Sequence, residues 1–304
     1  MHLTAELSDI SRCSVHDGPG VRTVVYFKGC ALRCAWCHNP ETLSHRPTLM
    51  HLETKCIGCQ RCVELCPVHA AKDGIHTISH ELCRGCGACA DACPSGALHL
   101  VGETVTVEEL LGRILKDKHY YDASGGGVTL SGGECLLQAE FCEMLLRECR
   151  AHGIHSAIES ALHVTYESIE RVLPYADLFF ADLKLATPER HREYTGQSNA
   201  RILENLLRLS HTDVHLVVRI PIIPSVNDTP REQRGIAEVL MTLGEAVREV
   251  ELLKYNPLAE GKYRAVGASY TSFAREGQTD EQMETLRDTL SRAIGARFPV
   301  TFRR

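Results

Sequence analysis

The sequence lacks most of what marks a secreted, membrane or nucleic-acid-binding protein. In its 304 residues no run approaches the roughly 20 apolar residues of a membrane-spanning helix. The first residues, MHLTAELSDISRC, lack the basic start and apolar stretch of a secretory signal. There is no long basic run and the formal net charge is −6, so nucleic acid is not the expected partner. We therefore expect a cytoplasmic protein that binds neither membrane nor nucleic acid.

Cysteine is the residue in excess. The chain has 15 cysteines, and 11 of them fall in three clusters with short gaps between Cys30 and Cys93. In a short secreted chain this pattern would indicate disulfides, but in a long cytoplasmic chain it indicates thiolate ligands for a metal. The length of the chain predicts one large domain or two ordinary ones.

The second and third cysteine clusters form an internal repeat. CIGCQRCVELCP and CRGCGACADACP both read C-x2-C-x2-C-x3-C-P, the run of bacterial ferredoxins. Three close thiolates of such a run bind one 4Fe–4S cluster, and the fourth crosses to the other. A pair of zinc knuckles is the alternative, but zinc sites rarely show this spacing before a proline. The pattern predicts two ligand sets, Cys56, Cys59, Cys62 and Cys93 for one cluster and Cys83, Cys86, Cys89 and Cys66 for the other.

The first cysteine cluster stops at three. KGCALRCAWCHNPE holds Cys30, Cys34 and Cys37 in the spacing C-x3-C-x2-C, which leaves one iron of a 4Fe–4S cluster without a protein ligand. An open position on a metal lets a small molecule bind it, for example through an amine and a carboxylate. Cys13 or Cys135 could instead supply a fourth thiolate, and the spacing alone leaves both alternatives open.

Outside the cysteine repeat, short apolar strands alternate with amphipathic helical stretches. This alternation predicts an α/β fold with a parallel sheet of six strand–helix units, too few for the usual eight-unit barrel. Residues 48–100 contain the repeat and interrupt the first unit as an inserted domain, so the main domain comprises 1–47 and 101–304. The expected strands are 21–27, 128–131, 155–159, 178–184, 215–220 and 250–255.

Polar groups follow the predicted strands. Ligands of parallel α/β proteins bind at the carboxyl ends of the strands, so these groups are candidates for one site. The second strand ends in SGGE at 131–134 and the fifth carries Arg219. The other candidates at strand ends are Glu159, Asp182, Leu183, Lys184, Tyr255 and Asn256.

The C-x3-C-x2-C motif after a strand resembles the signature of radical S-adenosylmethionine enzymes. SVHDGPGVRTVVYFKGCALRCAWCHNPE and SGGGVTLSGGECLLQAEF resemble the activating enzymes of glycyl radical enzymes, and the likeness covers nearly the whole chain. It implies a partial (β/α)6 barrel with an inserted bacterial ferredoxin-like domain. It also implies three 4Fe–4S clusters, with S-adenosylmethionine bound through its amine and carboxylate to the open iron of the first.

By this resemblance the chain is an oxidoreductase that reductively cleaves S-adenosylmethionine to methionine and a 5′-deoxyadenosyl radical. The radical takes a Cα hydrogen from a glycine of a partner glycyl radical enzyme of the lyase or dehydratase class. Reduced flavodoxin or ferredoxin is the implied electron donor, the activase acts as a monomer, and no residue serves as acid or base. The implied contacts to S-adenosylmethionine are Trp36, Cys37, His38, Gly133, Glu134, Glu159, Asp182, Leu183, Lys184 and Asn256.

Two alternatives stand beside this hypothesis. A three-cluster electron-transfer protein would not cleave S-adenosylmethionine and would leave the strand-end residues unexplained. A radical enzyme acting on a small molecule or peptide is disfavoured by the activase-like stretches. Three positions depart from the family pattern, since many relatives have proline or a small residue at Cys135, aspartate at Glu159 and histidine at Asn256.

Overall fold

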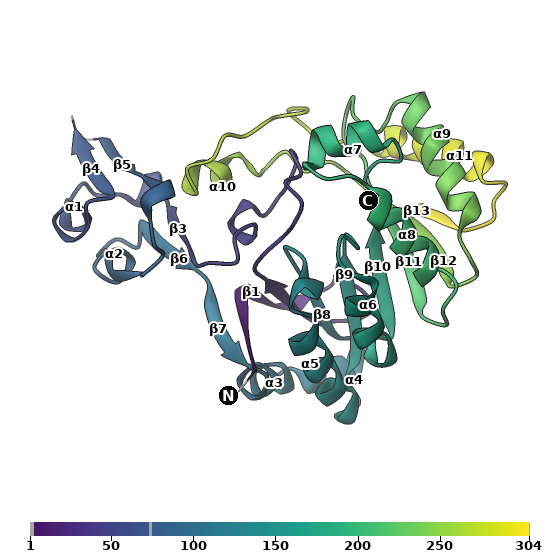
Figure 1. The fold of residues 1–304 in the computed structure, drawn as a ribbon, viewed down its shortest axis with the longest axis horizontal. Coiled ribbons are helices and arrows are strands. Elements are labelled where there is room, and N and C mark those ends of the chain that lie inside the picture. Colours follow the sequence, from purple (N-terminus) through teal and green to yellow (C-terminus); the bar gives the residue numbers. More distant parts are fainter. Residues whose placement is uncertain (1–2, 73–74, 304) are drawn as a thin grey trace.

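The main body of the protein is built on one nine-stranded mixed sheet, in the order β13-β12-β11-β10-β9-β8-β2-β1-β7 (Figure 1). A computed structural model describes residues 3–72 and 75–303. The predicted domain ranges also contain residues 1–2, 73–74 and 304, which lie outside the described residues.

The parallel part of the sheet follows chain order. Seven strands pair in parallel, each with the next, in the order β2, β8, β9, β10, β11, β12 and β13. All six predicted strands are among them. Their apolar side chains are buried, as in Val24, Val25 and Phe27 of β2, because helices cover the sheet. The bounds are β2 Arg22–Phe27, β8 Gly127–Gly132, β9 His155–Ser160, β10 Leu178–Asp182, β11 His215–Pro221, β12 Val247–Leu253 and β13 Val300–Phe302.

Two antiparallel strands extend one edge of the sheet, and the hydrophobic pattern predicts neither. β1 (Thr4–Ser14) pairs with β2 on one side and with β7 (Glu103–Thr106) on the other. Only its first half is buried, through Ala5 and Leu7, whereas the rest carries polar and exposed side chains. A half-exposed strand near an edge has no continuous apolar run, so the hydrophobic pattern of the sequence does not reveal it.

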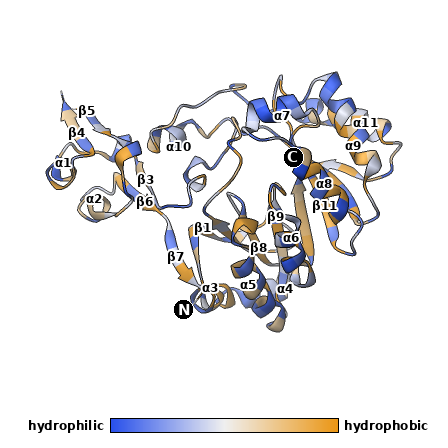
Figure 2. Ribbon diagram, in the orientation of Figure 1, coloured by the Kyte–Doolittle hydropathy of each residue, from blue (hydrophilic) through white to orange (hydrophobic). Residues whose placement is uncertain are grey.

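The helices pack apolar stripes against the sheet. α5 buries Phe141, Leu145 and Cys149 at helical spacing. Figure 2 shows hydrophobic residues along the strands, and both hydrophobic and hydrophilic residues along the helices. None of the described helices is long and apolar enough to cross a bilayer. The helices are α3 Val107–Leu115, α4 Lys118–Ser124, α5 Ala139–Ala151, α6 Tyr166–Val172, α7 Pro188–Thr195, α8 Ala200–Leu209, α9 Pro230–Thr242, α10 Glu260–Ala265 and α11 Asp280–Ala293.

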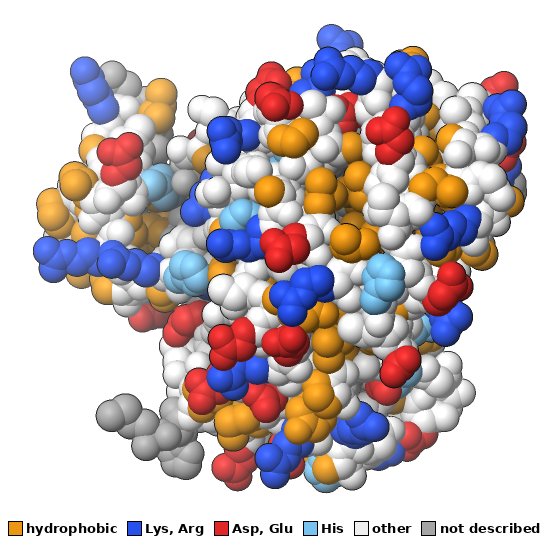
Figure 3. Space-filling view, turned by 45° about the vertical axis from the view of Figure 1, so that its right-hand side comes forward, with side chains coloured by type: hydrophobic (Ala, Val, Ile, Leu, Met, Phe, Trp, Pro, Cys, Tyr) orange, Lys and Arg blue, Asp and Glu red, His pale blue; other side chains and the backbone are white. Residues whose placement is uncertain are grey.

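Between β2 and β7 the chain leaves the sheet and forms a small projecting lobe, on which Figure 3 shows exposed hydrophobic side chains. Its backbone repeats: Gly58 and Gly85 have φ of +67° and +66°, and Gln60 and Gly87 adopt left-handed conformations before α1 and α2. The sequence repeat is therefore also a structural repeat. The elements are β3 Thr48–His51, α1 Arg61–Leu65, β4 His69–Lys72, β5 Ile75–Ile78, α2 Ala88–Asp91 and β6 Leu98–Val101.

Candidate functional site

The carboxyl ends of the parallel strands open onto a cavity of about 350 Å³, a size typical of small-molecule sites. The loop with the first three cysteines forms one wall, and the ends of β8 to β12 form the others. Glu134 and Leu183 do not line this cavity, although the sequence places them beside it. The predicted residues that do line it are Cys30, Cys34, Trp36, Cys37, His38, Gly133, Glu159, Asp182, Lys184 and Asn256.

The cysteine loop has no regular secondary structure and is held by contacts with other elements. Its Arg33 and Ala35 amides donate to the carbonyls of Thr195 and Tyr194 at the end of α7, each at 2.8 Å. Within the loop the Cys37 amide donates to the Cys34 carbonyl at 2.9 Å. The positions of the three thiols therefore depend on the folded sheet and helices around them.

Burial disfavours the ionised form of the three thiols. It raises the pKa of Cys30 to about 11 and that of Cys34 to about 12, and it raises the pKa of Cys37 as well. Such thiols stay protonated at neutral pH until a metal replaces their protons. Soft thiolates in this number suit an iron–sulfur cluster with one open iron.

Neither candidate for a fourth thiolate lines the cavity. The Cys135 sulfur is fully buried behind the cavity wall, 3.7 Å from the carbonyl oxygen of Leu130 and 3.6 Å from that of Glu159. Cys13 is exposed on β1. The structure therefore favours the open alternative that the sequence alone left undecided.

The Gly132-Gly133 turn packs directly against the start of the cysteine loop. Gly132 has φ of +115°, and a Cβ at Gly133 would lie 2.3 Å from the carbonyl oxygen of Gly29. The amide of Glu134 donates to that same carbonyl at 2.8 Å. Only glycine permits this approach, so the turn brings backbone to the cavity beside the thiols.

Glu134 uses its side chain within the protein. Its carboxylate accepts hydrogen bonds from the Ser160 hydroxyl and the Ala161 amide, each at 2.9 Å, and from the Leu136 amide at 3.3 Å. Burial nevertheless raises its pKa to about 7. Leu183 is likewise buried, with only 1% of its surface exposed. The structure thus places both predicted contacts behind the cavity wall.

Lys184 and Asp182 bring opposite charges to the cavity. The Lys184 ammonium lies 2.6 Å from a carboxylate oxygen of Asp182. Burial opposes the charged lysine, but the Asp182 carboxylate outweighs it and raises the Lys184 pKa. The ammonium is therefore a permanent cation beside the cysteine loop.

Arg219 is part of the site as well, and it forms the centre of a network across three strands. Its guanidinium pairs with Glu159 on β9 and, at 2.7 Å, with Glu251 on β12, and it lies 3.5 Å from the ring centroid of Phe180. Ser131 donates to Glu159 at 2.6 Å. The only sequence signal for this network is an arginine inside the apolar strand β11.

Aromatic side chains close one side of the cavity. Trp36 packs against Tyr194 and Phe273, with ring centroids 6.2 and 6.1 Å apart. Next to it, the Nε2 atom of His38 is buried without a hydrogen-bond partner among the described residues. Burial lowers the His38 pKa, so this neutral ring nitrogen is available to a ligand in the cavity.

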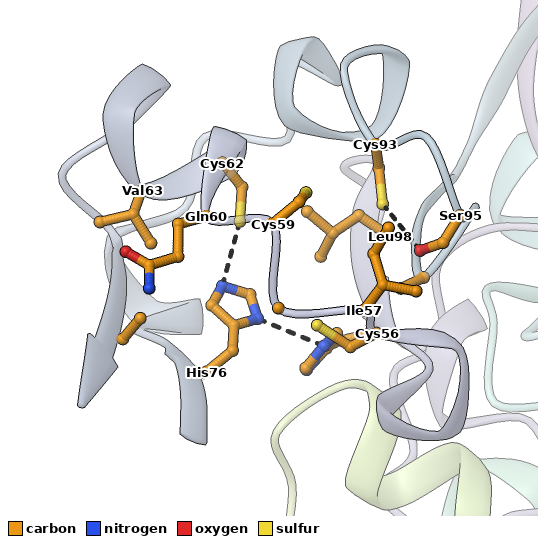
Figure 4. A pocket seen from close by; sticks show the side chains of 14 residues that line it. Cys56, Ile57, Cys59, Gln60, Cys62, Val63, His76, Cys93, Ser95 and Leu98 are labelled. Atoms are coloured by element: carbon orange, nitrogen blue, oxygen red, sulfur yellow. Dashed lines mark hydrogen bonds between the residues drawn. The ribbon is translucent and has the colours of Figure 1, made fainter. Parts of the chain in front are cut away.

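Four cysteines of the insert lie around a second, smaller cavity. Cys56, Cys59, Cys62 and Cys93 surround one cavity of about 50 Å³ (Figure 4). Of the other predicted set, Cys89 is buried and Cys83 packs against the same hydrophobic cluster, and burial raises the pKa of Cys89 to about 11.

Comparison with known proteins adds the family. The model of the radical SAM superfamily matches residues 24–234. The chain is 43% identical over 270 residues to the (2S)-3-sulfopropanediol dehydratase activating enzyme of Klebsiella oxytoca, covering 86% of this chain and 85% of that protein. It is 44% identical over 264 residues to the isethionate sulfite-lyase activating enzyme of Oleidesulfovibrio alaskensis, covering 84% of each. The chain belongs to the radical SAM activating enzymes of glycyl radical enzymes.

A solved structure supports the fold of this activating enzyme. A radical SAM methyltransferase from Sphaerobacter thermophilus superposes with a TM-score of 0.55 at 13% identity, covering 98% of this chain and 76% of that one. The site residues fit the cofactors of the family on their own chemistry. Three thiols without a fourth suit a 4Fe–4S cluster, and Lys184, Asp182 and the free nitrogen of His38 suit the charged and polar groups of S-adenosylmethionine.

Proposed function

We propose that this activating enzyme carries three 4Fe–4S clusters, one in the main cavity and two in the insert, and generates a glycyl radical on a partner enzyme. The observation that carries the proposal is the set of three buried thiols, Cys30, Cys34 and Cys37, on a cavity that no other described cysteine lines. When bound, the first cluster and S-adenosylmethionine supply the reductive cleavage whose 5′-deoxyadenosyl radical removes a glycine Cα hydrogen.

Residues of the cavity hold and orient S-adenosylmethionine. The Lys184 ammonium pairs with its carboxylate, and Asp182, 2.6 Å from that ammonium, fixes the lysine in place. Gly133 lines the cavity with its backbone, which can receive the amino group. These contacts bind charged ends of the molecule, so they set its orientation toward the cysteine loop.

Other residues hold the adenosine half and exclude water. Trp36 is an apolar part of the wall and is backed by Phe273, while His38 and Asn256 offer polar atoms on the same cavity. Arg219 neutralises Glu159 and fixes its carboxylate at the rim, where it can accept hydrogen bonds from ribose hydroxyls. A dry and prearranged site protects a reactive radical from side reactions.

The insert is a ferredoxin-like domain of residues 48–100 that delivers electrons to the cavity. Cys56, Cys59 and Cys86 are exposed, which suits the approach of a redox protein such as reduced flavodoxin or ferredoxin. Its crossed ligand sets are supported by Cys93, which lines the cavity of Cys56, Cys59 and Cys62. The activating enzyme works as a monomer that meets its electron donor and its glycyl partner in turn.

The first test is reductive cleavage under anaerobic conditions. Reconstituted protein receives dithionite and S-adenosylmethionine, and 5′-deoxyadenosine is quantified for the wild type, Cys34→Ala and the control Cys13→Ala, whose residue is exposed on β1. We expect cleavage by the wild type and the control and none by Cys34→Ala. No cleavage by wild type with all clusters loaded would leave the electron-transfer alternative.

The partner is tested by electron paramagnetic resonance. The activated mixture is incubated with candidate glycyl radical enzymes, among them the sulfopropanediol dehydratase and the isethionate lyase named for the relatives. A glycyl doublet that requires both S-adenosylmethionine and Cys34 identifies the partner. Cleavage without a doublet on any glycyl radical enzyme, but with turnover of a small molecule, would support the other alternative.

A further inference from the structure

Three histidines from three strands meet beside one cysteine set of the insert. His76 on β5 lies between His69 on β4 and His51 on β3, with ring nitrogens 2.9 and 3.2 Å apart. The same Nε2 atom of His76 that faces His69 lies 3.4 Å from the sulfur of Cys62 (Figure 4). His51 and His69 are buried, with 8% and 4% of their surface exposed.

The contacts between these rings fix where the protons lie. Each contact between two ring nitrogens needs one N–H and one acceptor, and a neutral imidazole carries one of each. A cluster-bound Cys62 is a thiolate and needs a donor, so His76 must carry its proton on Nε2. Its Nδ1 atom then accepts from the Nε2–H of His51, and its own proton is shared between Cys62 and the Nδ1 atom of His69.

His69 ends this row of rings, because its Nε2 atom is buried without a hydrogen-bond partner among the described residues. In the opposite direction the proton of His69 would point at His76, and His76 would have no proton left for Cys62. Only the direction from His51 to His69 therefore gives a cluster sulfur its hydrogen bond.

The other half of the repeat has no such donor. Cys89 is the third cysteine of its motif, as Cys62 is of its own, but it is buried against Leu49 and Leu98. Among the described residues no side chain donates a hydrogen bond to its sulfur. The third cysteine of the first motif therefore faces a histidine, whereas the third cysteine of the second motif faces apolar side chains.

We propose that His76, held in its Nε2–H tautomer by His51, donates a hydrogen bond to the Cys62 sulfur and makes the cluster of Cys56, Cys59, Cys62 and Cys93 the higher in potential of the two insert clusters. The inference rests on the proposed three-cluster function. Hydrogen bonds to cluster sulfurs set the reduction potential, because they stabilise the more negative reduced state. An electron entering the insert then rests on this cluster, and His76 and His51 are positioning residues for electron transfer.

The test is a redox titration of the full chain with its main cavity cluster removed. In a background of Cys30→Ser, Cys34→Ser and Cys37→Ser, electron paramagnetic resonance follows the two insert clusters against applied potential. We expect His76→Leu to lower the reduction potential of one cluster only. The expected size is a tenfold change in the one-electron reduction equilibrium of that cluster, which corresponds to about 59 mV. His99→Leu is the matched control, because His99 is an exposed histidine of the same lobe on β6.

His51 separates a hydrogen-bond role from a packing role. His51→Leu removes the group that fixes the tautomer without touching Cys62, so the same cluster should shift in the same direction. His51→Gln can still donate to the Nδ1 atom of His76 and should restore the wild-type potential. Equal potentials for wild type, His51→Leu and His51→Gln overturn the proposal, and they do so even where His76→Leu loses its cluster.

Failure of the proposed function looks different. It would appear as background protein without two insert clusters, or with a zinc ion bound instead. Metal analysis would detect bound zinc. The insert offers two trios of candidate zinc ligands, one of His51, Cys56 and His76 and one of Cys62, His69 and His76. The ligand atoms of each trio lie within 4.8 Å of one another. Two clusters whose potentials ignore every histidine variant would leave the function intact and overturn the inference alone.

Discussion

The two cysteine-bearing regions of the molecule are stabilised in opposite ways. The loop of Cys30, Cys34 and Cys37 sits against the sheet core and is anchored to α7 by backbone hydrogen bonds. The hydrophobic cluster of the insert has three buried members, Leu49, Cys89 and Leu98, and the helices α1 and α2 have five and four residues.

The difference shows which site the protein forms by itself. A lobe with so little apolar burial cannot offset its conformational entropy, and small domains of this kind depend on metals. The cavity, by contrast, is formed by strand ends that the sheet holds in place. On the proposed function, we therefore expect the insert to need its two clusters for folding and the cavity to need its cluster only for chemistry.

The largest expected effect comes from removing iron. Chelation of the wild type should abolish hydrogen-exchange protection in residues 48–100 and leave β8 to β11 protected, because metal binding is folding free energy for the lobe alone. Exchange measured by mass spectrometry before and after chelation checks this. Equal protection of the lobe in both samples would contradict the comparison.

Next comes the cation of the cavity. Lys184→Met should raise the KM for S-adenosylmethionine at least tenfold, about 1.4 kcal/mol, because it removes the partner of a carboxylate and leaves Asp182 uncompensated. Cleavage rates at varied S-adenosylmethionine measure the effect. Lys118→Met on α4, whose partner is Asp122 at the surface, is the control and should leave the KM unchanged.

Glu134 should give the cavity wall a pH-dependent stability. Burial raises its folded-state pKa from 4.5 to about 7, so the folded state holds a proton that the unfolded chain has lost. This contribution, about 3 kcal/mol at most, is present below pH 4.5 and is lost as the pH rises through 7. Urea midpoints between pH 5.5 and 8 should fall with pH for wild type.

The matched variants locate that pH dependence. Glu134→Gln should flatten the fall of the urea midpoint, whereas Glu140→Gln on the exposed face of α5 should keep it. A midpoint that falls equally in wild type and Glu134→Gln would assign the effect to another group.

The smallest effect is expected where the cysteine loop meets α10. Lys262 pairs with Glu41 and donates to Asn39, each at 2.7 Å, but more than a third of its side chain is exposed. Exposed pairs of this kind contribute roughly 0.2–1 kcal/mol. Lys262→Ala should therefore raise the KM for S-adenosylmethionine less than about fivefold, and a loss as large as that of Lys184→Met would contradict this ranking.

The sequence predicted the six central strands because they are short apolar runs with both faces covered, such as β10 with Phe179 and Phe180. It also predicted most cavity residues, because strand ends of a parallel sheet meet at one edge. It could not place β1, whose second half is polar, or the network of Arg219, whose partners lie on other strands. Glu134 shows the same limit, since only the folded chain decides which way a side chain turns.

The pairing of β3 with β6 has a consequence for how the chain is assembled on the ribosome. Thr48 lies opposite Val101 in that small sheet, so the first and last residues of the lobe are neighbours. β2 ends at Phe27 and its partner β8 begins at Gly127, and closing such a long loop is entropically costly. A lobe that has already bound the two clusters proposed for it would join its own ends and shorten this loop. The strands after β8 then add to the growing edge in the order of their synthesis.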